Sequence, residues 1–131
     1  MSHFTTVKTV IRNVETLQET LRHLHYEFQA GDRLPIRGYR DNQQHGQVVI
    51  NTGSKYDIGF QRQSDETFNV CADWWGVNGN TDIREKAFLE QLNQSYAHLT
   101  VRGQVENEGY RIEVERVLEN GEIELVVCEN F

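Results

Sequence analysis

Two aspartates are the side chains of this sequence best placed for acid–base chemistry. Asp57 and Asp73 lie in neighbouring segments that alternate between apolar and polar residues, on the face away from Phe60 and Trp74. If the segments pair as strands, the two carboxylates approach each other, and like charges that share a site shift each other's pKa. Two carboxylates on one sheet face are more often its solvated side, so the pair alone does not predict catalysis.

The segment Gly76–Thr81, between a strand-like and a helix-like stretch, is the second candidate site. Backbone N–H groups at a helix N-terminus bind anions, and glycines let a phosphate approach closely. The segment matches neither glycine-rich phosphate-binding pattern, and Asp82, the expected cap of the next helix, would repel a phosphate. Two interpretations stay open: a flexible connector, or a site for a phosphorylated small molecule that uses Gly76, Gly79, Thr81 and Arg84 together with the Asp57 and Asp73 face.

A pair of tryptophans follows Asp73. Strand alternation sends Trp74 to the face of Phe68 and Val70 and leaves Trp75 on the opposite face. Because large aromatic side chains are usually mostly buried, we expect a helix or residues 31–46 to cover Trp75. The alternative is an exposed Trp75 that contacts a partner.

The densest charge pattern flanks Asn120-Gly121 near the C-terminus. This dipeptide predicts a two-residue type I′ turn, which places Glu119 opposite Glu122. The apolar face toward the helices would then hold Ile112, Val114, Leu118, Ile123, Leu125 and Val127. The outer face would hold five glutamates: Glu113, Glu115, Glu119, Glu122 and Glu124. A solvated surface is the ordinary explanation, but because opposed like charges are destabilising, the face also predicts a docking surface for a protein partner, and a basic one would relieve the repulsion.

The charge balance limits the class of partner. The chain has 13 Lys and Arg against 20 Asp and Glu, a net charge of −7. This excess of acid argues against nucleic-acid binding, which needs Lys and Arg to neutralise phosphates. No apolar run is long enough to span a membrane, and the first residues lack the basic and apolar regions of a secretory signal. We therefore expect a soluble, cytoplasmic protein with no nucleic-acid or membrane partner, and the oligomeric state stays open.

Residue spacing gives little sign of metal or redox chemistry. The five histidines form no metal-ligand pattern, since His23 and His25 do not share a helical face. Cys71 and Cys128 are expected to be small buried apolar residues in a reducing compartment. No pattern of a nucleophile with its base is present. The sequence predicts no cofactor, no metal and no catalytic residue, and it leans away from an enzyme.

Periodicity defines the elements of the N-terminal half. A strand over residues 4–11 precedes a helix that Asn13 caps and that ends near Phe28. Pro35 restricts the next extended piece to an edge strand or a loop. Three further strands are expected at 47–51, 56–61 and 68–74.

The second helix is expected to begin at a capping box of Asp82 and Glu85. Whether it continues through Gly103 as far as Gly109 stays open, since a glycine can kink or divide a helix. The chain then closes with the hairpin.

These elements predict a single α+β domain over residues 1–131, a length typical of one domain. We expect a mostly antiparallel sheet with two helices packed on one face and a C-terminal β-hairpin. One core should contain residues of both helices and the middle strands: Leu17, Leu21, Ile58, Phe60, Phe68, Val70, Trp74, Phe88 and Leu92.

Four stretches carry a family resemblance, namely residues 1–11 (MSHFTTVKTVI), 56–60 (YDIGF), 72–77 (ADWWGV) and 94–98 (QSYAH). With them the chain resembles, over nearly its whole length, the hypothetical chloroplast reading frame thirty-five family of cyanobacteria and algal plastids. The resemblance implies a source in the cyanobacterial cytoplasm or the plastid stroma. It implies no activity and no catalytic residues, because the family has none assigned.

The leading hypothesis is therefore a non-catalytic interaction or regulatory protein that docks a protein partner through the acidic hairpin face, with Trp75 as a further contact. The alternative is a small-molecule binder or enzyme that uses Gly76–Thr81 and the Asp57 and Asp73 face.

Overall fold

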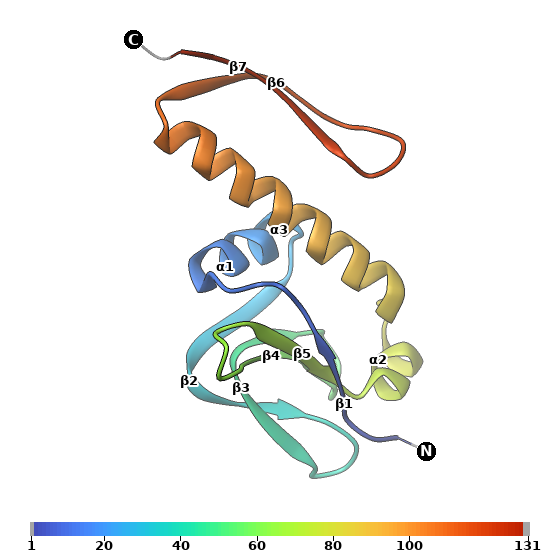
Figure 1. Cartoon of the computed structure of the whole chain (residues 1–131). Coiled ribbons are helices and arrows are strands. Elements are labelled where there is room, and N and C mark those ends of the chain that lie inside the picture. Colours follow the sequence, from blue (N-terminus) through green and yellow to red (C-terminus); the bar gives the residue numbers. More distant parts are fainter. Residues whose placement is uncertain (1, 130–131) are drawn as a thin grey trace.

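The computed structural model describes residues 2–129 as an α+β fold with antiparallel sheets, which confirms the predicted class. Its elements are β1 (Thr5–Lys8), α1 (Val14–His23), β2 (Glu27–Arg37), β3 (Gln43–Asn51), β4 (Ile58–Arg62), β5 (Phe68–Ala72), α2 (Trp74–Asn80), α3 (Glu85–Asn107), β6 (Tyr110–Val117) and β7 (Ile123–Glu129). Five strands form one sheet in the order β1-β5-β4-β3-β2, and β6 and β7 form a separate sheet. Helix α3 lies between the two sheets (Figure 1).

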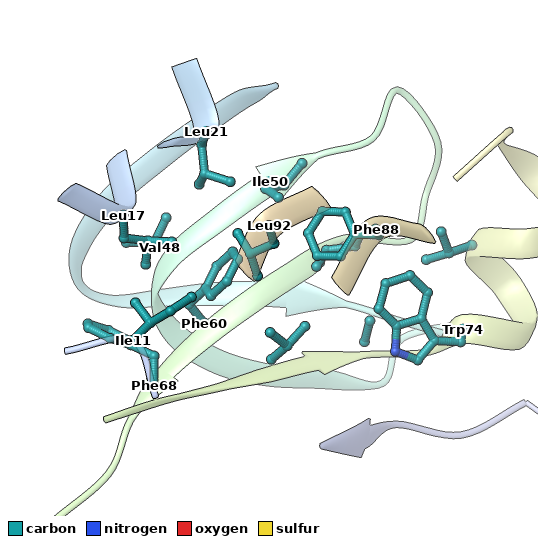
Figure 2. Close-up of a cluster of buried hydrophobic side chains, with 14 residues drawn as sticks. Ile11, Leu17, Leu21, Val48, Ile50, Phe60, Phe68, Trp74, Phe88 and Leu92 are labelled. Carbon is teal, nitrogen blue, oxygen red and sulfur yellow. The ribbon is translucent and has the colours of Figure 1, made fainter. Parts of the chain in front are cut away.

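The core lies between the five-stranded sheet and helices α1 and α3. Phe60 pairs with Val48 on one side and Val70 on the other, so alternate apolar residues of β3, β4 and β5 face the same way. Figure 2 shows these side chains meeting Leu17 and Leu21 of α1 and Phe88 and Leu92 of α3. All nine residues predicted for the core are buried in this cluster, so the alternation in the sequence predicted the register of the middle strands correctly.

Helix α1 begins as predicted but ends earlier. The Asn13 side chain accepts a hydrogen bond from the Thr16 backbone N–H at 3.0 Å. The helix stops at His23, and His25 adopts a left-handed φ of 64° that turns the chain. The predicted end near Phe28 is wrong, because this residue already lies in β2, opposite Ile50.

Strand β2 is the edge strand that Pro35 indicated. Its pairing with β3 is irregular between Ala30 and Leu34, where extra residues bulge out of β2. Beyond the bulge, Ile36 lies over Gly59 on the outer face of the sheet, and a Cβ on Gly59 would come within 2.1 Å of the Ile36 side chain. A second small core forms there from Ile36, Val49 and Cys71.

The chain between β5 and α3 differs from the prediction. Strand alternation ends at Ala72, and Asp73 caps the short helix α2 where the sequence suggested a continued strand and a loop. Asp82 caps nothing, since α3 begins at Glu85 with Arg84 as its N-cap and without a side-chain cap bond. Helix α3 runs without a break through Gly103 to Asn107. Among the described residues, no helix has the length and apolarity that crossing a membrane requires.

The terminal hairpin forms, but its turn and register differ from the prediction. The Leu118 N–H donates to the Glu122 carbonyl at 2.7 Å, and the Gly121 N–H donates to the Leu118 carbonyl at 2.9 Å. Gly121 alone of the two predicted turn residues has a positive φ, 85°, so the connection is a three-residue loop over residues 119–121 with a glycine bulge and not a two-residue type I′ turn. Val117 therefore pairs with Ile123, and a second shift follows between Ile112 and Val114.

Candidate functional site

The first predicted candidate, Asp57, is held in a clamp between two strands. Its side chain is almost completely buried, and its Oδ2 accepts hydrogen bonds from the backbone N–H of Arg37 at 2.8 Å and from the Arg37 Nε at 2.9 Å. The guanidinium also donates to Oδ1 at 2.8 Å. The hydrogen bond to Asp57 raises the pKa of Arg37. The pair fastens the end of β2 to the start of β4.

Asp73 has different partners. The register puts it one step beyond the Ile58–Ala72 pair, next to Asp57 in the backbone. Its Oδ1, however, accepts a hydrogen bond from the Gly76 N–H at 3.2 Å, and its Oδ2 accepts one from the Ser2 hydroxyl. Each aspartate thus accepts hydrogen bonds from its own donors, and among the described residues no hydrogen bond joins the two carboxylates.

The second candidate, Gly76–Thr81, is not a flexible loop: it forms most of α2 together with the C-cap of that helix, Thr81. Gly76 touches the ring of Tyr56, and a Cβ on Gly76 would lie 2.0 Å from a ring carbon. Gly79 has open space around it. The Thr81 hydroxyl donates to the Val77 carbonyl at 2.8 Å.

Arg84 completes this helix end, because its NH1 donates to the carbonyls of Thr81 at 2.9 Å and Asn78 at 3.3 Å. Gly76 and Arg84, both proposed for phosphate, therefore serve local packing, whereas Gly79 does not. Positive charge at the carbonyl end of a short helix is a common stabilising arrangement.

Trp75 is exposed, contrary to the expectation that a helix or residues 31–46 would cover it. Its side chain is 64% exposed, whereas that of Trp74 is 7% exposed and packs against Phe88, with ring centroids 5.7 Å apart. Both tryptophans lie on α2, so helical geometry decides their directions. Sequence reasoning placed Trp74 correctly in the core and chose the wrong one of the two alternatives for Trp75.

The inner face of the terminal hairpin meets α3 through polar groups. Glu115, predicted for the outer face, points to α3: its Oε1 lies 3.2 Å from Arg102 NH1 and its Oε2 lies 3.1 Å from His98 Nε2. The His98 contact lacks hydrogen-bond geometry, so its attraction depends on the histidine being charged. Gln94 Nε2 donates to the Gly121 carbonyl at 3.2 Å. Ile112, Ile123 and Leu125, predicted for this face, are partly buried, so the hairpin attaches to the helix through polar and apolar side chains together.

The outer face of the hairpin is a mixed stripe and not a row of glutamates. Arg116 pairs across the strands with Glu124, and Arg111 pairs with Glu113 at 3.3 Å. Between these ion pairs lie two exposed valines, Val114 at 42% and Val126 at 39%. The altered register causes this arrangement, because a shift of one residue exchanges the faces of a strand.

The tip of the hairpin keeps its negative charge. Glu119 and Glu122 lie in the turn, and in the part of the chain that the structure describes neither forms an ion pair. Over residues 110–129 the sequence has six acidic and two basic side chains. The hairpin therefore combines exposed apolar residues with an excess of negative charge.

The cysteines and histidines give no reactive centre. Cys71 is buried in the outer cluster of the main sheet, and burial raises the pKa of its thiol to about 11, while Cys128 is partly exposed on the hairpin. Between Ser2 and Glu129 no group of three or more metal-ligating side chains comes together. Sequence reasoning missed the Arg37–Asp57 and Arg102–Glu115 pairs, because nothing in the spacing of these residues signals contacts between distant elements.

Comparison with known proteins supplies relatives. Residues 20–126, from α1 into β7, match the profile of a family described as "Protein of unknown function (DUF1257)". An uncharacterized protein ycf35 of Guillardia theta is 30% identical over 129 residues, 97% of this chain and 96% of that protein. Proteins of the same name from Cyanophora paradoxa and Pyropia yezoensis are 31% and 26% identical over the same shares. These relatives confirm the family resemblance seen in the sequence, and no solved structure matches the chain.

Proposed function

The chain belongs to the DUF1257 family of proteins of unknown function, and we propose that it is a non-catalytic interaction or regulatory protein that docks a basic protein partner through its terminal hairpin. One observation carries the proposal. The hairpin forms its own two-stranded sheet next to α3, exposes valines on its outer face, and carries two glutamates at its tip for which the described residues provide no ion pair.

The construction of the hairpin supports a role in docking. An isolated two-stranded hairpin is marginally stable. Here no residue from 110 to 129 is fully buried, and polar contacts with α3 add to the partly buried apolar side chains. Val114 and Val126 offer apolar area on the outer face. A partner that covers these valines would gain about 25 cal/mol of free energy for each Å² of apolar surface removed from water.

The charge of the hairpin supports a basic partner. Glu119 and Glu122 at the tip add to the excess of acid over the hairpin as a whole. A positively charged partner gains association rate from such a surface, and the gain falls as salt screens the charges. We also propose the cyanobacterial cytoplasm or plastid stroma as the compartment, which the plastid-bearing sources of the relatives support.

Trp75 is the second contact that we propose. It lies on α2, near the N-terminal end of α3, whereas the chain enters the hairpin from the C-terminal end of that helix (Figure 1). Trp75 would therefore touch a different part of a partner. Exposed tryptophans are frequent anchors of protein interfaces.

The proposal can be tested with a peptide of alternating lysine and valine, about as long as β7, as the probe. Calorimetry at low salt should detect binding, and NMR shifts should concentrate in residues 110–129. The variant Glu119→Gln/Glu122→Gln should weaken binding about 3- to 10-fold, the effect of about 0.7–1.4 kcal/mol of lost attraction. The matched control Asp41→Asn/Asp82→Asn removes the same charge from exposed positions away from the hairpin and should retain most of the affinity.

Two results would overturn the proposal. The peptide could fail to bind at any salt concentration, or the control could lose as much affinity as the hairpin variant. In the second case the peptide responds only to the net charge of −7 and not to the hairpin.

A further inference from the structure

The free edges of the two sheets are built differently. β1 is four residues long and ends in Lys8. β2 is long, but a bulge that contains Asp32 and Arg33 interrupts it and Pro35 follows. Short strands, charges, prolines and bulges are the means by which proteins prevent a sheet edge from pairing with another chain. Both edges of the five-stranded sheet are protected in this way.

The β7 edge has less of this protection, since two glutamates are its only charged residues. The strand reads Ile-Glu-Leu-Val-Val-Cys-Glu over Ile123–Glu129, without proline, glycine, lysine or arginine, and the shift in the hairpin falls on β6, between Ile112 and Val114. Within residues 2–129, β6 is the only strand that pairs with β7. The second edge of β7 therefore presents unpaired backbone groups.

The register identifies those groups. The hydrogen bond from the Leu118 N–H to the Glu122 carbonyl marks a hydrogen-bonded pair, and such pairs alternate with non-bonded pairs along an antiparallel ladder. Glu124 and Val126 then direct their N–H groups to β6. Ile123, Leu125 and Val127 direct theirs away from the hairpin, in a row that matches one edge of an added strand.

We propose that the β7 edge binds an extended basic segment of a partner protein as a third strand. This inference rests on the proposed function and specifies how the partner docks. The third strand would give the hairpin the sheet size that independent stability needs. Main-chain hydrogen bonds would supply affinity, and side-chain pairing along β7 would supply specificity.

The chemistry of the added strand follows from its neighbours. On the outer face, its side chains would meet Val126, Glu124 with its partner Arg116, and Glu122 at the tip, which has no ion pair among the described residues, so a basic and an apolar residue should alternate there. On the face toward α3 they would extend the row of Ile123, Leu125 and Val127, which favours apolar residues. A lysine- or arginine-bearing strand rich in β-branched residues is the segment that fits.

Amide hydrogen exchange, with the lysine–valine peptide as the probe, distinguishes strand addition from docking on the outer face. On binding, exchange at Ile123, Leu125 and Val127 should slow at least tenfold. Glu124 and Val126, whose N–H groups already bond to β6, should change much less. Docking on the outer face would shift the side-chain signals of Val114 and Val126 and leave this alternating pattern absent.

A proline at the free edge gives an independent test. Val127→Pro removes only an outward N–H, and proline is tolerated at such edge positions, so the hairpin should fold while peptide binding falls at least tenfold. Val127→Thr keeps the N–H and should bind almost as the unaltered protein does. The hairpin signals of Val127→Pro in the free state report whether the fold survives.

The outcomes separate this inference from the proposed function. A peptide that binds the hairpin without slowing exchange at the three amides, or that binds Val127→Pro unchanged, overturns strand addition and leaves docking on the outer face. A peptide that does not bind the hairpin overturns both. Protection of the same amides that grows with protein concentration, without peptide, would assign the edge to a second copy of the chain and overturn the basic partner.

Discussion

The five-stranded body and the terminal hairpin are stabilised in different ways. In the body, large apolar side chains such as Phe60, Phe68 and Phe88 are buried without measurable exposure or nearly so. In the hairpin, five of the residues from Val114 to Val127 are large apolar side chains that remain exposed, and Glu115 makes ionic contacts with the helix below. The body therefore carries most of the buried apolar surface that stabilises the fold, while the hairpin keeps large apolar side chains in contact with solvent.

The largest expected effect contrasts the two tryptophans of α2. Trp74→Ala opens a cavity beside Phe88 and should lower the free energy of unfolding by about 3–5 kcal/mol. Trp75→Ala removes an exposed ring and should change it by less than about 0.5 kcal/mol. Chemical denaturation measures both. A large loss in Trp75→Ala would show that this ring has a structural partner, and its role as a docking contact would fail.

The next contrast concerns two glycines of the same short helix. Gly76→Ala forces a methyl group against the Tyr56 ring and should cost about 1–3 kcal/mol. Gly79→Ala meets open space and should be neutral or stabilise by up to about 1 kcal/mol, because alanine is the better helix former. Thermal melts of the two variants test the packed helix end directly. Equal melting temperatures would mean that residues 76–81 are as loose as the sequence suggested.

The same two regions show how far the sequence could predict the fold. Ile58, Phe60, Phe68 and Val70 alternate in strands whose one face is buried, and burial leaves only one register possible. The hairpin has no such constraint, since apolar residues lie on both of its faces. Asn120-Gly121 then fits more than one turn type, and the turn that forms shifts the register, so Glu115 faces α3 in place of the predicted acidic face.

The candidate site was predictable only in part for a related reason. Trp75, Asp57 and Asp73 were recognisable by residue type, but their partners were not. Arg37 lies 20 positions before Asp57, and Ser2 lies 71 positions before Asp73. Pairs of this kind depend on the final arrangement of the strands, which the spacing of residues along the sequence does not reveal. The sequence did not reveal the change from strand to helix at Asp73, because strand alternation and helical periodicity both place Trp74 in the core.

A smaller effect should appear where the hairpin meets α3. Glu115→Gln removes the charge between Arg102 and His98 and should cost about 1 kcal/mol or less, as partly exposed ion pairs do. The loss should be local: hydrogen exchange should quicken in β6 and β7 and stay unchanged at Phe60 and Val70. Glu122→Gln, at the tip, is the matched control and should leave exchange as it was. Faster exchange throughout the body would show that hairpin and body unfold as one unit.

The smallest effect compares the two thiols, one in each region. Burial raises the pKa of Cys71 from 9.0 to about 11, so at mildly alkaline pH its thiolate, the reactive form, is scarce. An alkylating reagent should therefore label Cys128 in the folded protein and reach Cys71 only after unfolding.

The same shift has a consequence for stability. A raised pKa means that the folded state holds its proton longer than the unfolded chain does, so the stabilisation is complete below the unfolded value of 9.0 and is lost as pH rises through about 11. Over that interval the protein should lose more stability than Cys71→Ala does, whereas Cys128→Ala should follow the unaltered protein. Denaturant melts across this pH range measure the difference. Burial also raises the pKa of Tyr26, but this acts equally in all three proteins and cancels from the comparison. Two results together would contradict this prediction: stability falls equally with pH in Cys71→Ala and the unaltered protein, and both thiols are labelled at one rate. The outer cluster of Ile36, Val49 and Cys71 would then open as readily as the hairpin, and the body would be less rigid than its packing indicates.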